Sequence, residues 1–254
     1  MEYYLQLKDL MKAGMDLPAW QEFYVKFVQA FVEGDRWKQY LQGVGNTLMV
    51  TALSLIIGVI LGVVVAVIRT AHDQQRPSKK SPLLGFANGI CQVYVTVIRG
   101  TPMLVQLLIM GFVIFSTSRH YTAIGILTLG INSGAYVAEI IRGGLMSLDP
   151  GQAEAGRSLG LNYIDTMRFI VIPQAFKAIL PSLGNEFIIL LKDTSLIKII
   201  GGKELVYAAD AIMTRTYEQM FPLLGTAFIY LVLVIIFTWL VGILERRLRQ
   251  SDRR

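Results

Sequence analysis

The sequence predicts an all-helical integral membrane protein, and three observations support this fold class. Of its 254 residues 54% are hydrophobic and only 17% are charged, whereas soluble proteins carry about 25% charged residues. Segments 44–68 and 222–244 contain no charged residue, and each is long enough to cross about 30 Å of hydrocarbon as a helix. Further apolar runs lie between them, which leaves little chain for a separate soluble domain.

Residues 1–43 are predicted to form an amphipathic arm outside the membrane. A spacing of three and four residues places one set of mainly aromatic side chains on a single helical face: Trp20, Phe23, Tyr24, Phe27, Val28 and Phe31. Such a helix either lies on the outer leaflet or packs on a neighbouring extracytoplasmic element. The arm is too long and too acidic for a signal peptide, so no cleavage is expected.

Five membrane crossings are expected within a transmembrane domain at 44–244. They are predicted at 44–68, 102–115, 122–141, 174–191 and 222–244. The second is preceded by apolar residues 83–98, and the two pieces together are too long for one span. We expect a break at Arg99-Gly100-Thr101-Pro102, where Thr101 caps a new helix and Pro102 occupies its first turn. The earlier piece is expected to slant or to lie in the interface.

The distribution of charge predicts the orientation of these spans. Segment 69–82 and the basic tail 245–254 each have a net charge of +3, whereas segments 1–43 and 193–221 each have −1. The positive-inside rule then places the N-terminus outside and the C-terminus in the cytoplasm. The same rule accounts for the overall charge of +6, so no nucleic acid partner is expected.

Two carboxylates fall inside predicted spans, where a charge costs at least about 2.5 kcal/mol unless it faces protein or water. Glu139 lies three residues before Arg142, a spacing that favours an ion pair on one helical face over a contact with substrate. Glu186 lies beside Asn185 and has no basic residue at helical spacing. It either lines the substrate pathway or a gate, or makes an interhelical bond.

Other polar residues are weaker candidates for the pathway. Tyr136 follows Asn132 by four residues and Ser133 by three, so the three residues either share a stripe that faces the pathway or contribute to helix packing. Lys192 and Asp193 follow the fourth span. They either order an outer gate by pairing or form a solvated helix end.

A long cytoplasmic stretch, 142–172, follows the third span. Pro150-Gly151 predicts a turn, Ala153 to Leu159 a short helix, and Gly160 the left-handed residue that ends it. This short helix is either a passive part of the loop or an element that docks into a groove on another protein.

The spacing of this stretch resembles that of a known family. Glu154-Ala155-Gly156, three residues, Gly160, nine residues and Ile170-Val171-Ile172-Pro173 resemble the EAA loop of type I ABC-transporter permeases, whose pattern is Glu-Ala-Ala, x3, Gly, x9, Ile-x-Leu-Pro. Gly156 and Ile172 depart from it. Segments 99–102, 136–144 and 192–196 resemble the polar-amino-acid branch, which takes up histidine, glutamate, glutamine, arginine or opines. The resemblance covers about 40–244.

The resemblance implies the ABC type-1 permease fold and a role as permease subunit of an ATP-driven importer of polar amino acids. The implied location is the bacterial cytoplasmic membrane, and the implied mechanism is alternating access. The implied partners are two ABC ATPase subunits, a second permease copy or paralogue, an extracytoplasmic solute-binding protein, the amino acid and membrane lipid. Contact with the ATPase is assigned to seven residues: Gly151, Gln152, Glu154, Ala155, Gly156, Gly160 and Pro173. Structural roles are assigned to Arg99, Gly100, Thr101, Pro102 and Arg142.

The chain is not expected to be an enzyme. It contains no G-x-x-x-x-G-K-[ST] motif, and Gly201-Gly202-Lys203 is followed by Glu204, so ATP and Mg²⁺ are expected on the partner ATPase. One cysteine and two isolated histidines give no metal-ligand spacing, and no cofactor is expected. Two alternatives stay open. An ion-coupled secondary transporter would ordinarily show an inverted repeat, which is absent here, and a membrane-embedded enzyme would rest on Ser133-Gly134 alone.

Overall fold

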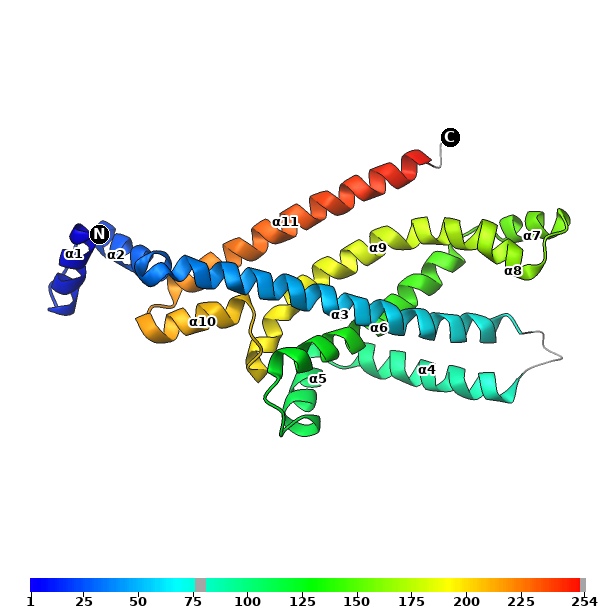
Figure 1. Ribbon diagram of the computed structural model, residues 1–254, viewed down its shortest axis with the longest axis horizontal. Coiled ribbons are helices and arrows are strands. Elements are labelled where there is room, and N and C mark those ends of the chain that lie inside the picture. Colours follow the sequence, from blue (N-terminus) through cyan, green and yellow to red (C-terminus); the bar gives the residue numbers. More distant parts are fainter. Residues whose placement is uncertain (76–80, 252–254) are drawn as a thin grey trace.

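The structure, a computed structural model, describes residues 1–75 and 81–251, with side chains up to residue 248. All regular elements in this part of the chain are helices, which confirms the predicted fold class. Figure 1 shows the long helices extended along one axis, with the N-terminal arm at one end and α7 and α8 at the other. Four stretches are long and apolar enough to cross a membrane: Glu33–Asp73, Pro82–Gly100, Tyr121–Met146 and Met220–Leu248.

The described part of the chain has the arrangement of ends that the charges predict. The C-terminal ends of α3 (Arg36–Asp73) and α11 (Met220–Ser251) lie at the same end of the molecule as α7 (Pro150–Ser158), opposite the arm (Figure 1). Several residues counted in the charge argument, at 76–80 and 252–254, lie outside the described residues. Which end faces the cytoplasm therefore stays a prediction.

Helices α3 and α6 (Tyr121–Met146) form the centre of the bundle. Glycines of α3 let the two backbones approach closely: a Cβ on Gly58 would lie 2.7 Å from Ser133 Oγ, and one on Gly62 would lie 2.5 Å from Val137. Small residues at such contacts are typical of helix packing in membranes. Both helices extend beyond their predicted spans, because no helix-breaking residue lies at the predicted boundaries.

The chain breaks between α4 (Pro82–Gly100) and α5 (Met103–Ile109), where the sequence predicts it. The roles of the two pieces are the reverse of the prediction, which made 102–115 the membrane span and let 83–98 slant or lie in the interface. Helix α4 is a long apolar candidate span, whereas the run Met103–Ile114, which includes the π-helical turn η2 (Met110–Ile114), is classed as a shorter apolar helix. At about 1.5 Å per residue that run covers only about 18 Å, so 102–115 cannot cross the bilayer alone.

The predicted cap of α5 is also wrong. Pro102 is the residue that precedes the helix, and Thr101 is the extended residue that follows α4. The Thr101 hydroxyl donates back to the Val97 carbonyl, 2.8 Å away. The buried side chain of Gln106 instead covers the break, because its amide donates to the Ile98 carbonyl at 2.8 Å and to the Thr101 carbonyl at 3.2 Å.

Helix α9 (Ile172–Asp193) packs on α3, α6 and α11 and follows the π-helical turn η3 (Met167–Val171). It contains the predicted fourth span but is not among the four candidate spans. Its charged residues, Lys177, Glu186, Lys192 and Asp193, lower its hydropathy. The predicted count of five crossings therefore stays a prediction. Pro181 lies inside α9 and removes one backbone hydrogen bond from it.

The arm contains two helices, α1 (Glu2–Lys12) and α2 (Ala19–Phe31), followed by the short 3₁₀ turn η1 (Glu33–Asp35). At the same end of the molecule, the 3₁₀ helix η4 (Thr194–Ile200) and α10 (Leu205–Thr216) connect α9 to α11. Helix α2 packs on α1, α10 and α11, so the arm is joined to the bundle.

Candidate functional site

Helix α7 is a short helix with defined caps at both ends. It begins at Pro150, earlier than predicted, because the Asp149 carboxylate caps it by accepting from the Gly151 N–H at 2.9 Å. Gly160 has a φ of +84°, which confirms the predicted left-handed stop. The Leu161 N–H then donates to the Gly156 carbonyl at 3.1 Å, as in a Schellman motif.

One side of α7 packs against the segment that leads into α9, which also includes α8 (Tyr163–Thr166). Gly156 is buried there, and a Cβ at this position would lie 2.8 Å from Ile170 and 3.0 Å from Thr166. The departure from the alanine of the family pattern thus coincides with a close approach. The Gln174 amide of α9 also donates to the Gln152 side chain at 3.2 Å. The Tyr163 hydroxyl donates a hydrogen bond to the side chain of Gln74, the residue that follows α3.

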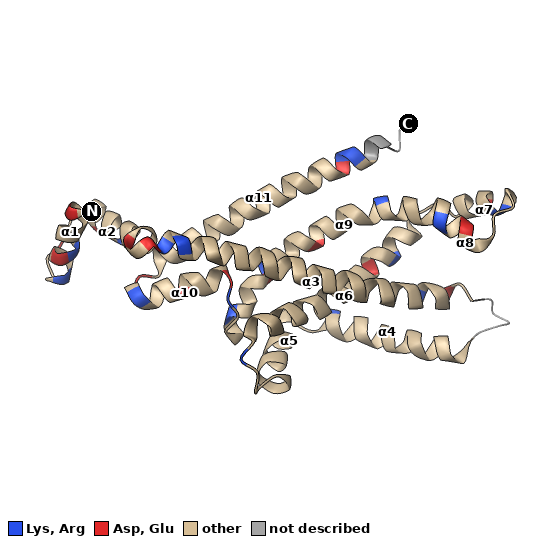
Figure 2. Cartoon of the chain, viewed as in Figure 1, with Lys and Arg blue, Asp and Glu red and all other residues tan. Residues whose placement is uncertain are grey.

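Helices α7 and α8 form one unit at the end of the molecule (Figure 2). The side of this unit that faces away from α9 is exposed. Two large apolar side chains protrude there, with Leu159 82% and Ile164 71% exposed. The remaining residues assigned to ATPase contact are exposed as well, unlike Gly156: Gly151, Gln152, Glu154, Ala155, Gly160 and Pro173. The unit therefore offers a rigid, partly apolar surface that is joined to α9.

Glu139 is paired with two arginines. It accepts from Arg142 at 3.0 Å, which is the ion pair that the spacing predicts, and it also pairs with Arg69 of α3. All three side chains are mostly buried. The cluster joins α3 to α6 near the end that carries α7. The sequence did not predict Arg69 as a partner, because the two residues are far apart in the chain.

Glu186 is buried where α3, α6 and α9 meet. Its Oε1 accepts a hydrogen bond from Ser133 Oγ at 2.8 Å, and Gly58 of α3 lies against the same serine. Asn185, the neighbour assigned to the same pathway, is exposed on a different side of α9. The structure therefore brings Glu186 together with Ser133 and not with Asn185.

Asn132 and Tyr136 face a different neighbour from Ser133. The Asn132 amide donates to Gln106 Oε1 at 3.0 Å, and the Arg99 guanidinium lies 5.2 Å from the centroid of the Tyr136 ring. Both contacts reach the break between α4 and α5. The three residues do not form one stripe, because Ser133 points toward α9.

At the C-terminal end of α9 the predicted gate pair is not formed. Among the residues that the structure describes, no ion pair joins Lys192 to Asp193: the lysine is exposed and the aspartate is half-buried. The ion pair in this region is Lys198 with Asp210, 3.0 Å apart, which ties η4 to α10. Because adjacent helical residues point about 100° apart, Lys192 and Asp193 are poorly placed to pair.

Sequence reasoning missed a buried polar cluster around Glu204. This carboxylate is 1% exposed and caps α10 by accepting from the Val206 N–H at 2.6 Å and the Tyr207 N–H at 2.7 Å. The Tyr230 hydroxyl of α11 donates to it at 3.0 Å. Burial raises the pKa of Glu204 to about 7. The sequence signal was an acidic residue two positions after Gly202, directly before an apolar run.

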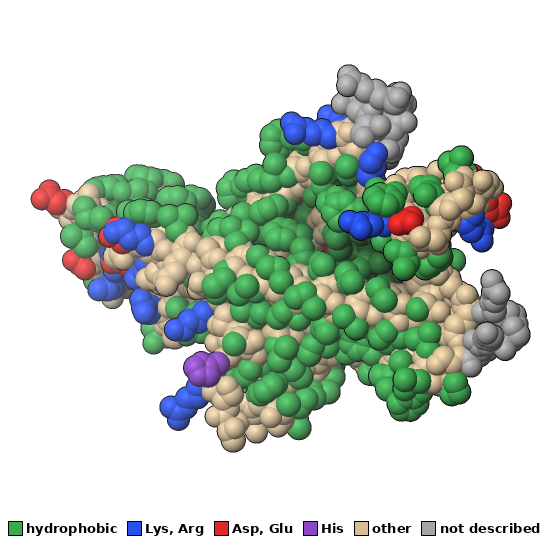
Figure 3. All heavy atoms as spheres, turned by 45° about the vertical axis from the view of Figure 1, so that its right-hand side comes forward, with side chains coloured by type: hydrophobic (Ala, Val, Ile, Leu, Met, Phe, Trp, Pro, Cys, Tyr) green, Lys and Arg blue, Asp and Glu red, His purple; other side chains and the backbone are tan. Residues whose placement is uncertain are grey.

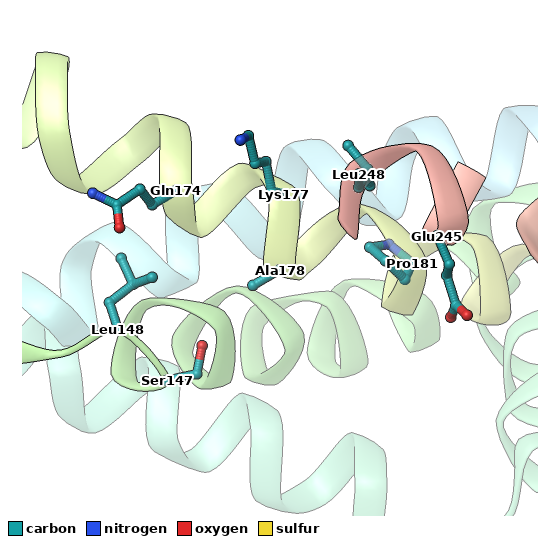
Figure 4. A pocket seen from close by; sticks show the side chains of 8 residues that line it. All are labelled: Ser147, Leu148, Gln174, Lys177, Ala178, Pro181, Glu245 and Leu248. Atoms are coloured by element: carbon teal, nitrogen blue, oxygen red, sulfur yellow. The ribbon is translucent and has the colours of Figure 1, made fainter. Parts of the chain in front are cut away.

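A hollow of about 450 Å³ lies beside the start of α9, near α7. Figure 4 shows that its lining comes from the end of α6, from α9 and from α11. Lys177 and Glu245 supply charged groups to a lining that is otherwise apolar or neutral, and Pro181 is part of it. The hollow therefore separates α9 from α11 on the side where α7 packs.

Comparisons with known proteins agree on one family. Residues 83–250 match the family described as the binding-protein-dependent transport system inner membrane component. The chain is 36% identical over 217 residues to the arginine transport system permease protein ArtQ of Bacillus subtilis (strain 168), covering 84% of this chain and 93% of that protein. It is 34% identical over 214 residues to the glutamine transport system permease protein GlnP of Escherichia coli (strain K12), covering 82% and 92%.

Two solved structures have the same fold. A crystal structure of an amino acid ABC transporter with histidines matches with a TM-score of 0.74 and 40% identity, over 83% of this chain and 94% of that one. An inward-facing structure of the MetNI methionine ABC transporter matches with a TM-score of 0.68 over 86% and 99%. Its identity is 18%, so this second likeness concerns the fold alone.

Proposed function

This chain belongs to the family of binding-protein-dependent transport system inner membrane components, and on that premise we propose that it is the permease subunit of an ATP-driven amino acid importer. The observation that carries the proposal is α7. This capped helix is exposed on one side, is closely packed on the other against the segment that begins α9, and carries the family's loop pattern.

In this proposal α7 is the contact with the ATPase. Leu159 and Ile164 enter a groove on an ABC ATPase subunit, and Glu154 lies at its polar edge. Because Gly156 leaves no space between α7 and Ile170, a push on α7 moves the start of α9 as well. The ATPase binds ATP and Mg²⁺ and hydrolyses the ATP. Two ATPase subunits serve two permease subunits, which are either identical or paralogous.

Helix α9 then transmits the movement to the substrate pathway. Pro181 and the preceding π-helical turn weaken its backbone ladder, and such sites are where helices bend. Glu186 and its partner Ser133 lie on the far side of Pro181. We place them on the wall of a central path that opens alternately to each side of the membrane.

The substrate we propose is a polar amino acid. The relatives named above transport arginine and glutamine, and the similar transporter was solved with histidines. A buried carboxylate such as Glu186 suits a solute that carries an ammonium group or donates hydrogen bonds. The solute is delivered by an extracytoplasmic binding protein, which fits an orientation with the N-terminus outside and α7 in the cytoplasm.

Site-specific photocrosslinking tests this assignment. A photoreactive residue in place of Glu154 should crosslink to an ATPase subunit when the assembly is kept in its native membrane. The same residue in place of Lys12, on the arm at the opposite end, is the control and should not crosslink to it. If neither position captures a nucleotide-binding subunit, or if only position 12 does, the proposed coupling is wrong.

A further inference from the structure

The N-terminal arm, residues 1–35, lies outside the segment that matches the family and forms a helical hairpin of α1 and α2 (Figure 1). Its two helices share a small apolar core. Tyr4 and Leu7 of α1 pack against Val25 and Val28 of α2, and all four are buried. The hairpin therefore fills its core without using the aromatic side chains of α2.

Four aromatic residues of α2 remain exposed, and we call them the aromatic face: Trp20, Phe23, Tyr24 and Phe27. Trp20 is 61%, Phe23 58% and Phe27 43% exposed. Exposed apolar area costs roughly 25 cal/mol per Å² in water, and grouped apolar residues indicate a contact surface. The aromatic face therefore requires an environment other than water.

The aromatic face lies against the beginning of α11. The ring centroid of Phe23 lies 4.9 Å from that of Phe221, in an edge-to-face arrangement, and the centroid of Phe27 lies 6.3 Å from it. One turn further along, Phe31 lies against Gly225. None of the apolar window of α11 is buried. Leu223, Leu224 and Phe228 of α11 are exposed, so the aromatic face of α2 packs beside a helix that itself exposes large apolar side chains.

Several charges of the arm are held in ion pairs. Lys26 lies 2.7 Å from Glu22 and 3.6 Å from Glu218, the second residue before α11, and Lys8 pairs with Glu33. Figure 3 shows hydrophobic side chains gathered along the upper edge of the arm, with charged side chains at its left and lower edges. A polar side opposite an aromatic side is typical of helices at a membrane surface.

We propose that the aromatic face of α2 is a membrane anchor, seated in the headgroup region of the leaflet at the end opposite α7. Trp and Tyr favour that depth because an apolar ring carries a polar group. The contacts with Phe221 and Glu218 join this anchor to the beginning of α11. The anchor thereby fixes the height of α11 in the bilayer. It concerns lipid alone and is independent of the proposed ATP coupling.

Fluorescence quenching by brominated phosphatidylcholine tests the anchor. The chain carries W37F and W239F, so that Trp20 is its only tryptophan. It is purified and reconstituted in bilayers whose lipids carry bromine at either a shallow or a deep position of the acyl chain. We expect Trp20 to lose more fluorescence with shallow than with deep bromine. Two control chains carry W20F together with W37F and W239F. The first adds F228W, about 10 Å beyond Phe221 along α11, and deep bromine should quench it more than shallow bromine. The second adds K12W, which neither lipid should quench.

Cysteine labelling gives a second measurement, because Cys91 is buried. F23C should react with a membrane-impermeant maleimide far more slowly than K12C in the same bilayers. The anchor is excluded if Trp20 is quenched by neither lipid, or if F23C reacts as fast as K12C. A Trp20 that is shielded only in the presence of a binding protein or a second copy also overturns it. None of these readouts requires the ATPase, so they do not depend on the crosslinking result.

Discussion

Ser133 of α6 donates a hydrogen bond to Glu186 of α9 across 2.8 Å, in a buried position where Gly58 of α3 leaves no room for further atoms. This contact joins the helix that precedes α7 to the helix that follows it. A relative movement of α6 and α9 must therefore break or reshape the contact, whichever role the carboxylate has in the pathway.

Replacing Glu186 tests whether it contacts the solute. Because a hydrogen bond to a charged group contributes about 1.5–3 kcal/mol, E186Q is expected to lower transport of a cationic amino acid about ten- to hundredfold. Binding-protein-dependent uptake into vesicles measures the effect, and copurification of the ATPase reports assembly. S133A is the matched control, since it keeps the carboxylate and should have the smaller effect. Unchanged uptake by E186Q would remove Glu186 from the pathway.

The Glu139 cluster is expected to stabilise the bundle. E139Q leaves the guanidinium groups of Arg69 and Arg142 close together without their shared carboxylate, so we expect a loss of about 1–3 kcal/mol. Thermal unfolding in detergent measures the loss. R142Q removes one arginine but keeps the pair between α3 and α6, and it should cost less. If R142Q costs as much as E139Q, the pair with Arg69 contributes nothing.

Gly160 is expected to be needed for coupling. An alanine at its φ of +84° is strained by about 1–2 kcal/mol, so G160A should loosen the end of α7 and lower transport per ATP hydrolysed. G160P should abolish the turn and uncouple the two activities. G143A is the control, because nothing lies within 4 Å of a Cβ there and alanine favours a helix. Normal coupling in G160P would exclude a role for this turn.

Glu204 predicts a pH dependence of stability. Its pKa is about 7 in the folded chain and 4.5 as the ordinary value, so between these values the folded state binds the additional proton. The contribution of Glu204 to stability should therefore be greatest below pH 4.5 and fall as the pH rises to about 7. E204Q should flatten this dependence in thermal unfolding curves, whereas D210N, which alters the exposed pair with Lys198, should retain it. If the difference in stability between wild type and E204Q does not fall over this range, the raised pKa of Glu204 is wrong.

The sequence was sufficient for the fold class, for the break near Thr101 and for the end of α7, because these depend on local signals: apolar length, proline, and glycine with positive φ. It was insufficient where a contact is set by distant helices. Gln106 appeared only as a lone polar residue in an apolar run, yet it completes the hydrogen bonds at the break. Lys192 and Asp193 appeared adjacent and oppositely charged, but the helix directs them apart. Glu204 was considered only as the residue after Gly201-Gly202-Lys203 that departs from the phosphate-binding motif.

The junction between the arm and α11 provides the last prediction. A Cβ on Gly225 would lie 2.5 Å from the Phe31 ring, and that ring has little freedom, since the ring centroids of Phe27 and Tyr40 are 5.1 Å and 5.4 Å away. Overpacking of this kind costs about 1–3 kcal/mol, so G225A should lower the unfolding temperature of the chain.

The double variant G225A/F31L separates overpacking from a general effect of alanine in α11. Leucine lacks the part of the ring that meets the new methyl group, so the two substitutions should be less damaging together than the sum of their separate effects, and a double-mutant cycle measures this coupling. A227S, at an exposed position of the same helix, is the control for a substitution elsewhere in α11 and should show no coupling to F31L. Additive effects of G225A and F31L would mean that α2 does not press on α11 at this glycine, and the arm would then be joined to α11 only through its contacts with Phe221 and Glu218.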